Sequence, residues 1–144
     1  MHKVVPQLQK QLNIPILHIA DATADALFDA GMKNVALLGT KYTMQQDFYK
    51  DKLLARGIRI MIPEEEDVEL VNRIIYNELC LGVVSDTSRR EYQRIIDMMK
   101  EHGAQGVILG CTEIGLLIHQ SDSSLPVFDT TQIHARAAAI RAVE

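Results

Sequence analysis

The sequence contains no tryptophan, and aromatic residues make up only 5% of its 144 residues. It has no basic surplus either, because 19 aspartates and glutamates outnumber 15 lysines and arginines and give a formal net charge of −4. Proteins that bind nucleic acids gather Lys and Arg on one face and stack bases on aromatic rings. Both features are scarce here, so we expect no nucleic-acid partner.

Long apolar runs are also missing. No run approaches the roughly 20 apolar residues that span a bilayer, so we expect no membrane span. No basic segment precedes a shorter apolar one, so we expect no signal peptide. The only cysteines are Cys80 and Cys111, too few for a disulfide framework, and a cytoplasmic location is the expectation. Histidines and cysteines do not fall at metal-ligand spacings, and no phosphate-loop, G-x-G-x-x-G or G-x-S-x-G motif occurs.

What is present is the composition of a soluble single domain, with 47% hydrophobic and 24% charged residues. Strand-like apolar segments alternate with amphipathic helical ones, which is typical of an α/β fold with a parallel sheet. We therefore predict a doubly wound, largely parallel sheet flanked by helices, with residues 58–62 near a sheet edge. The expected strands are residues 16–20, 35–38, 58–62, 107–109 and 126–128, and the expected helices are residues 1–13, 21–30, 43–56, 64–79, 86–102 and 129–144.

Cys111 follows a buried strand and Gly110, at the point where the next helix is expected to begin. In doubly wound proteins, strand carboxyl ends and helix amino ends face the same crevice, where ligands bind. The partial positive charge of a helix N-terminus favours thiolate over thiol, so a reactive cysteine is one hypothesis. A buried structural cysteine fits the same position equally well.

A second candidate site is the turn from Gly39 to Thr43, which also joins a strand end to a helix start. Free backbone N–H groups, two hydroxyls and Lys41 converge there and could hold a carboxylate or phosphate. The alternative is ordinary capping, in which Thr43 and Gln46 form a capping box and Lys41 is solvated.

Other polar residues are explained more simply by structure. Cys80 is expected on the buried side of a helix and His18 as a hydrogen-bonded core imidazole. The acidic run 64–67 is expected to be a solvated helix start, because negative charge is favourable in the first turn. For His134 both a structural and a functional role stay open.

Four segments together resemble the aspartate/glutamate racemase family, in particular its bacterial branch acting on both amino acids. The most specific is Gly110-Cys111-Thr112-Glu113-Ile114, similar to the second cysteine motif of that family. Three more agree in order, at residues 17–23, 38–44 and 128–130.

The resemblance implies a cofactor-independent isomerase without a metal, whose substrate is a small amino acid, aspartate and/or glutamate. In this family one cysteine removes the α-proton and another, on the opposite face, returns one. Cys111 matches the second of these cysteines. Thr40 and Thr43 would bind the substrate carboxylate, with Thr112 and Glu113 around the amino group. Cys80 lies where aspartate-preferring members commonly carry a lysine.

The first cysteine motif of the family has no counterpart in the sequence. By this resemblance, residues 1–20 are the remnant of a first lobe, residues 21–128 are the second lobe with a four-stranded sheet, and residues 129–144 form a helix that returns to the first lobe. The chain alone is then expected to be inactive or nearly so, and to associate as a homodimer or through exposed terminal helices. A related hydantoin, maleate or arylmalonate enzyme, or a non-catalytic binding module, are the alternatives.

Overall fold

Four parallel strands form the centre of the molecule, in the order β2-β1-β3-β4. The structure is a computed structural model that describes residues 4–144. The inner strands β1 and β3 are almost entirely buried, as continuous apolar runs require when helices cover both faces of a sheet. The strands are β1 (Asn34–Leu38), β2 (Arg59–Met61), β3 (Gly106–Leu109) and β4 (Val127–Asp129).

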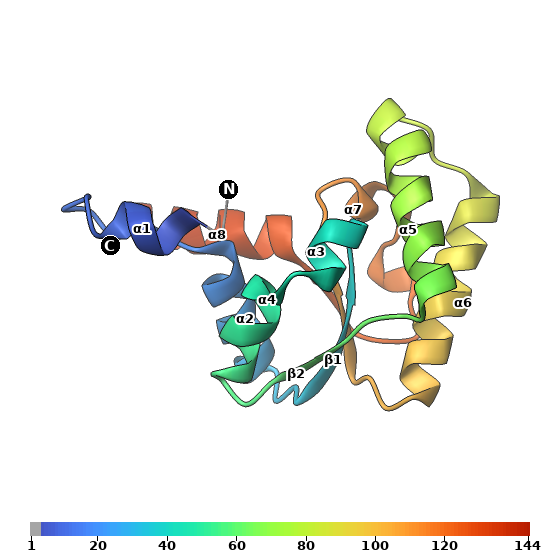
Figure 1. Cartoon of the computed structure of the whole chain (residues 1–144), viewed down its shortest axis with the longest axis horizontal. Helices are drawn as coiled ribbons and strands as arrows, with labels where there is room; N and C mark the ends of the chain where they lie inside the picture. The colour runs from blue at the N-terminus through green and yellow to red at the C-terminus, as the bar shows by residue number, and fades with distance from the viewer. Residues whose placement is uncertain (1–3) are drawn as a thin grey trace.

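Helices cover both faces of this sheet, which confirms the predicted doubly wound fold (Figure 1). α2 (Ile19–Asp29) and α4 (Asp47–Leu54) lie on one face, and α5 (Glu65–Asn77) and α6 (Asp86–Glu101) lie on the other. The short helices α3 (Lys41–Gln45) and α7 (Ile114–Leu117) sit at the carboxyl edge of the strands. The remaining elements are α1 (Val5–Gln9), α8 (Thr130–Val143) and the 3-10 turns η2 (Leu79–Leu81) and η3 (Gln120–Asp122).

The strand predicted for residues 16–20 is wrong, because α2 begins within it. The His18 side chain caps this helix: its Nδ1 accepts a hydrogen bond from the Ala20 backbone N–H at 3.0 Å. His18 is thus a buried, hydrogen-bonded imidazole, as predicted. The helix predicted for residues 1–13 is shorter than expected, because α1 covers only residues 5–9; residues 1–3 lie outside the described part of the chain.

The helix predicted for residues 43–56 is divided in two. Thr40, not Thr43, is the first cap: its hydroxyl accepts from the Thr43 N–H at 3.2 Å. Gln46 has extended backbone angles (φ −79°, ψ 151°) and separates α3 from α4, so the predicted capping box between Thr43 and Gln46 does not form.

The predicted acidic helix start is confirmed in α5, whose first turn contains three of the four acidic residues. One of them, Asp67, is not solvated as expected. It is buried, and its carboxylate accepts from the Arg94 guanidinium of α6 at 2.6 Å. This ion pair fixes α5 beside α6.

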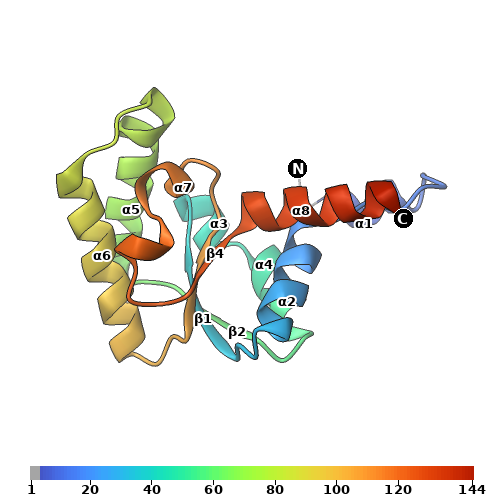
Figure 2. The ribbon, with the colours of Figure 1, turned by 180° about the vertical axis from the view of Figure 1, so that it is seen from behind.

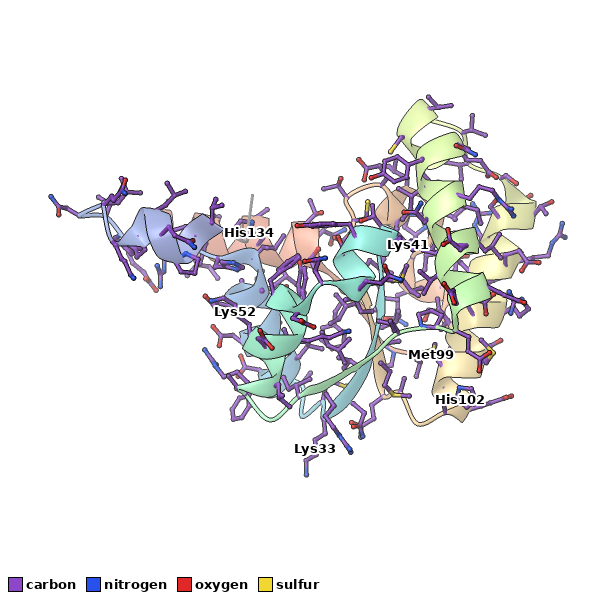
Figure 3. All side chains as sticks on the ribbon, in the orientation of Figure 1. Lys33, Lys41, Lys52, Met99, His102 and His134 are labelled. Carbon is purple, nitrogen blue, oxygen red and sulfur yellow. The ribbon has the colours of Figure 1, made fainter. Side chains whose placement is uncertain are left out.

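The terminal helices α1 and α8 run side by side and project from the body of the molecule (Figures 1 and 2). We call residues 4–14 and 135–143 the arm. At its base α8 packs against α2, and the His134 Nε2 lies 3.0 Å from the Leu17 carbonyl oxygen (Figure 3). No residue of α1 is buried, and α8 buries only Thr130. The exposed large apolar side chains of the arm are Val4, Leu8, Leu12, Ile14, Ile140 and Val143.

Candidate active site

Two strand-to-helix turns meet at the carboxyl edge of the sheet, one after β1 and one after β3. Leu38 and Leu109 are register partners, and the Gly110 N–H donates to the Leu38 carbonyl at 2.7 Å. A Cβ on Gly110 would lie 2.9 Å from the Leu37 Cδ1 and 3.3 Å from the Leu38 carbonyl oxygen, so a larger residue would crowd β1 at this point. The turns that carry Thr43 and Cys111 are therefore neighbours, as the sequence predicted.

A cavity of about 260 Å³ opens at this edge, and Cys111 lies in its wall. The cavity combines hydroxyl groups with apolar side chains, a typical lining for a small polar ligand. Its lining residues are Ile19, Thr43, Phe48, Tyr49, Gly110, Cys111, Thr112, Thr130 and Thr131.

The Cys111 thiol donates a hydrogen bond to the carboxylate of Glu113, with Sγ and Oε2 separated by 2.8 Å. Burial first, and then the hydrogen bond to Glu113, together raise the pKa of Cys111 to about 12. The expectation that a helix N-terminus favours the thiolate is wrong at this position. α7 is only four residues long and begins three residues after Cys111, so the nearby carboxylate and the loss of solvent outweigh its dipole.

Glu113 is the charged partner in this pair. The hydrogen bond from Cys111, and next a bond from Thr112, lower the pKa of the Glu113 carboxyl. Glu113 is therefore an anion at neutral pH, while Cys111 is a protonated thiol aimed at it. Such a pair can donate a proton from sulfur to a substrate carbanion.

Thr40 and Thr43 form the second half of the site. The Thr40 hydroxyl donates to the Thr43 hydroxyl at 3.1 Å, and Thr43 reaches the cavity while Thr40 lies behind it. Lys41 turns away instead: it forms an ion pair with Glu69, and its backbone N–H donates to Asn72 (Figure 3). Lys41 is thus neither free in solvent nor part of the cavity wall.

The prediction that Cys80 lies on the buried side of a helix is wrong, because Cys80 is exposed in η2. α5 ends at Asn77, and the change to a 3-10 turn rotates the following residues away from the buried stripe. η2 packs against α7, and the charge of a Cys80 thiolate would act on Cys111.

Five cavity residues were not predicted as site residues from the sequence: Ile19 of α2, Phe48 and Tyr49 of α4, and Thr130 and Thr131 of α8. A signal existed for the threonines, because they follow strand 127–129 just as Cys111 follows β3, so the same edge of the sheet must carry both. No comparable signal marks the aromatic residues, whose position depends on the break at Gln46.

None of the helices within residues 4–144 has the length and apolar character needed to cross a membrane. Within the same residues, no group of three or more His, Cys, Asp or Glu side chains is arranged to hold a metal ion.

Comparison with protein families gives one match that covers nearly the whole chain. The model of the Asp/Glu/hydantoin racemase family matches residues 1–138. Among curated proteins, the chain is 24% identical to the broad specificity amino-acid racemase RacX of Bacillus subtilis over 94% of this chain and 58% of that protein. It is 27% identical to the glutamate racemase of Oenococcus oeni over 80% of this chain and 42% of that protein.

Solved structures agree in fold. A candidate Asp/Glu racemase from Yersinia pestis is 51% identical, with a TM-score of 0.95, over 100% of this chain and 63% of that one. An aspartate racemase homologue from Pyrococcus horikoshii is 40% identical, with a TM-score of 0.92, over 99% of this chain and 63% of that one. The chain thus spans less than two thirds of the length of either structure.

Proposed function

Since the chain belongs to the Asp/Glu/hydantoin racemase family, we propose that it is one catalytic lobe of an amino-acid racemase and that Cys111 is its acid/base. The substrate class is aspartate and/or glutamate, and the reaction uses no cofactor because two thiols supply both proton transfers. The observation that carries this proposal is the Cys111 thiol, which lies in the cavity wall with its proton directed at Glu113.

The protonation states of this pair assign its step in the reaction. Because the pKa of Cys111 is raised to about 12, the side chain is a thiol at neutral pH and acts as the acid. The S–H bond breaks, its proton forms the new C–H bond at the α-carbon, and the electron pair stays on sulfur as thiolate. In the reverse direction this thiolate removes the α-proton.

Inversion at the α-carbon also needs a base on the opposite face. Within residues 4–144, no second thiol lines the Cys111 cavity, and Cys80 is exposed on η2. We therefore assign the opposing base to a first lobe outside this sequence, either on a longer chain or on a separate one. Alone, the chain is expected to racemise neither amino acid.

The hydroxyls of the cavity fit the substrate's polar groups. Thr43 points into the cavity and would donate to the α-carboxylate, while Thr40 orients the Thr43 hydroxyl by its hydrogen bond. Thr112 lines the cavity next to Cys111, and Glu113 lies behind the lining residues, hydrogen-bonded to the Cys111 thiol. From there the Glu113 anion would accept from the substrate ammonium group.

The arm is the surface where the first lobe would pack. Its six large exposed apolar side chains are 41% to 86% exposed, which is unusual for helices that need an apolar face to be stable. This assignment makes residues 1–20 part of the first lobe, residues 21–128 the second lobe, and residues 129–144 the helix that joins them. Without the first lobe, two copies of the chain would associate through the arm.

The test is reconstitution. The chain would be co-expressed with the part of the Yersinia pestis racemase candidate that lies outside the match, and racemisation of L-aspartate and L-glutamate followed by chiral chromatography. We expect activity from the combination and none from either part. Racemisation by the lone chain would overturn the half-site proposal, and a combination that assembles but acts on neither amino acid would overturn the proposed substrate class.

A further inference from the structure

The hydroxyl of Thr130 makes a buried contact with the strand that carries Cys111. Thr130 is the first residue of α8 and only 2% exposed, and its Oγ1 donates to the Leu109 carbonyl oxygen at 2.9 Å. Leu109 is the last residue of β3, two positions before Cys111. The hydrogen bond therefore ties the base of the arm to the backbone leading into the site.

This hydrogen bond is one of two that hold the peptide unit between Leu109 and Gly110. The Leu109 carbonyl and the Gly110 N–H belong to the same planar group. The N–H donates to Leu38 at 2.7 Å, and the carbonyl accepts from Thr130. With both ends held, the plane of this peptide cannot rotate, and its orientation sets the direction in which the chain enters Cys111.

Tyr49 lies beside Thr130 in the wall of the cavity and is also only 2% exposed. Burial raises the pKa of Tyr49 to about 12, and its interaction with Thr130 acts in the opposite direction. Tyr49 is therefore a neutral phenol at neutral pH.

We propose that Thr130 is a positioning residue for Cys111, acting through the Leu109–Gly110 peptide. The catalytic meaning of this role rests on the proposed function, whereas its test by alkylation does not. Because Thr130 also begins α8, its hydroxyl connects the helix that leads into the arm with the strand that leads to the thiol.

The first experiment measures alkylation of Cys111 by iodoacetamide in a Cys80→Ser background, where Cys111 is the only thiol. Thr130→Val keeps the side-chain shape and removes the hydroxyl. Without the hydrogen bond from Thr130 to Leu109, the thiol should leave its half-buried position beside Glu113. Its pKa should then move toward the free-thiol value of about 8.5, and the alkylation rate at pH 8 should rise at least threefold. The other titratable groups coupled to Cys111 are Glu113, Tyr92 and Cys80. Glu113 and Tyr92 are left unchanged, and residue 80 is serine in every protein compared.

Two further variants make the result specific. Thr130→Ser restores the hydroxyl and should restore the parent rate and pH profile, which a loss of packing alone would not predict. Thr130→Ala differs from Thr130→Ser only by the hydroxyl and should give a shift in the same direction as Thr130→Val, so the test stands even if Thr130→Val fails to fold by circular dichroism. A folded Thr130→Val protein with the parent pH profile, or a Thr130→Ser protein that resembles Thr130→Val, would overturn the proposal.

In the co-expressed two-lobe assembly, a misplaced thiol should lower kcat by about tenfold or more while KM changes much less. This readout separates the two proposals. An alkylation shift without any racemisation in the parent assembly would leave the positioning role intact and remove the proposed function. Normal racemisation by the Thr130→Val assembly would leave the function intact and remove the positioning role.

Discussion

Replacing Glu113 with Gln tests the electrostatic account of the site. The Cys111 Sγ lies 2.8 Å from the Glu113 Oε2, and this contact favours the protonated thiol. A hydrogen bond to a charged group contributes about 1.5–3 kcal/mol, and about 1.4 kcal/mol corresponds to one pKa unit. Because Glu113 is partly exposed, solvent screening puts the effect at the lower end of this range. We therefore expect the pKa of Cys111 to fall by about one unit.

The assay is the iodoacetamide rate at pH 8 in the Cys80→Ser background. A pKa lower by about one unit raises the thiolate fraction about tenfold. A less basic thiolate is also a weaker nucleophile, with a Brønsted slope of about 0.4–0.5, which removes about threefold of that gain. The net expectation is alkylation about threefold faster in Glu113→Gln.

The matched control is Glu101→Gln, which removes an exposed carboxylate at the end of α6 and should leave the rate unchanged. If Glu113→Gln reacts at the parent rate or more slowly, the carboxylate does not hold the thiol protonated, and the assignment of Cys111 as the resting acid fails.

Three other predictions follow from the fold and the site. The pKa of Cys111 is raised to about 12 in the folded protein. Its contribution to stability is therefore complete below the unfolded thiol pKa of about 8.5 and is lost as pH rises toward 12. Between pH 8 and pH 10.5, the free energy of unfolding in urea should fall more for the parent than for Cys111→Ser. Gly110→Ala should lower the free energy of unfolding by about 1–3 kcal/mol, measured by urea denaturation, because its Cβ would clash with the β1 strand. Leu8→Asp with Ile140→Asp should reduce association in analytical ultracentrifugation while changing stability little. The control is Phe28→Asp, which changes an even more exposed apolar residue on α2 and should not affect association.

The sequence predicts the sheet well, because its signals there are local. The inner strands are continuous apolar runs, and the edge position of residues 58–62 follows from their alternating pattern. The apolar run at residues 16–20 has the same appearance, yet it opens a helix. The difference is the His18 side chain, which caps α2, and histidine is not a residue whose capping role sequence patterns indicate.

The location of the site could also be predicted, but its electrostatics could not. Strand ends place Cys111 and Thr43 at one edge whatever the details of the turns. The direction of the Cys111 pKa depends on the length of α7 and on where the Glu113 side chain turns, and neither follows from the residue order. The exposure of Cys80 similarly depends on the exact end of α5.

Proton NMR tests most directly whether Cys111 protonates one face of the α-carbon. L-Aspartate and L-glutamate would be followed in D₂O with the co-expressed two-lobe assembly and with its Cys111→Ser variant. The parent assembly should replace the α-proton with deuterium as the D-enantiomer accumulates, and Cys111→Ser should form no D-enantiomer. Racemisation by Cys111→Ser at the parent rate would contradict this role of Cys111.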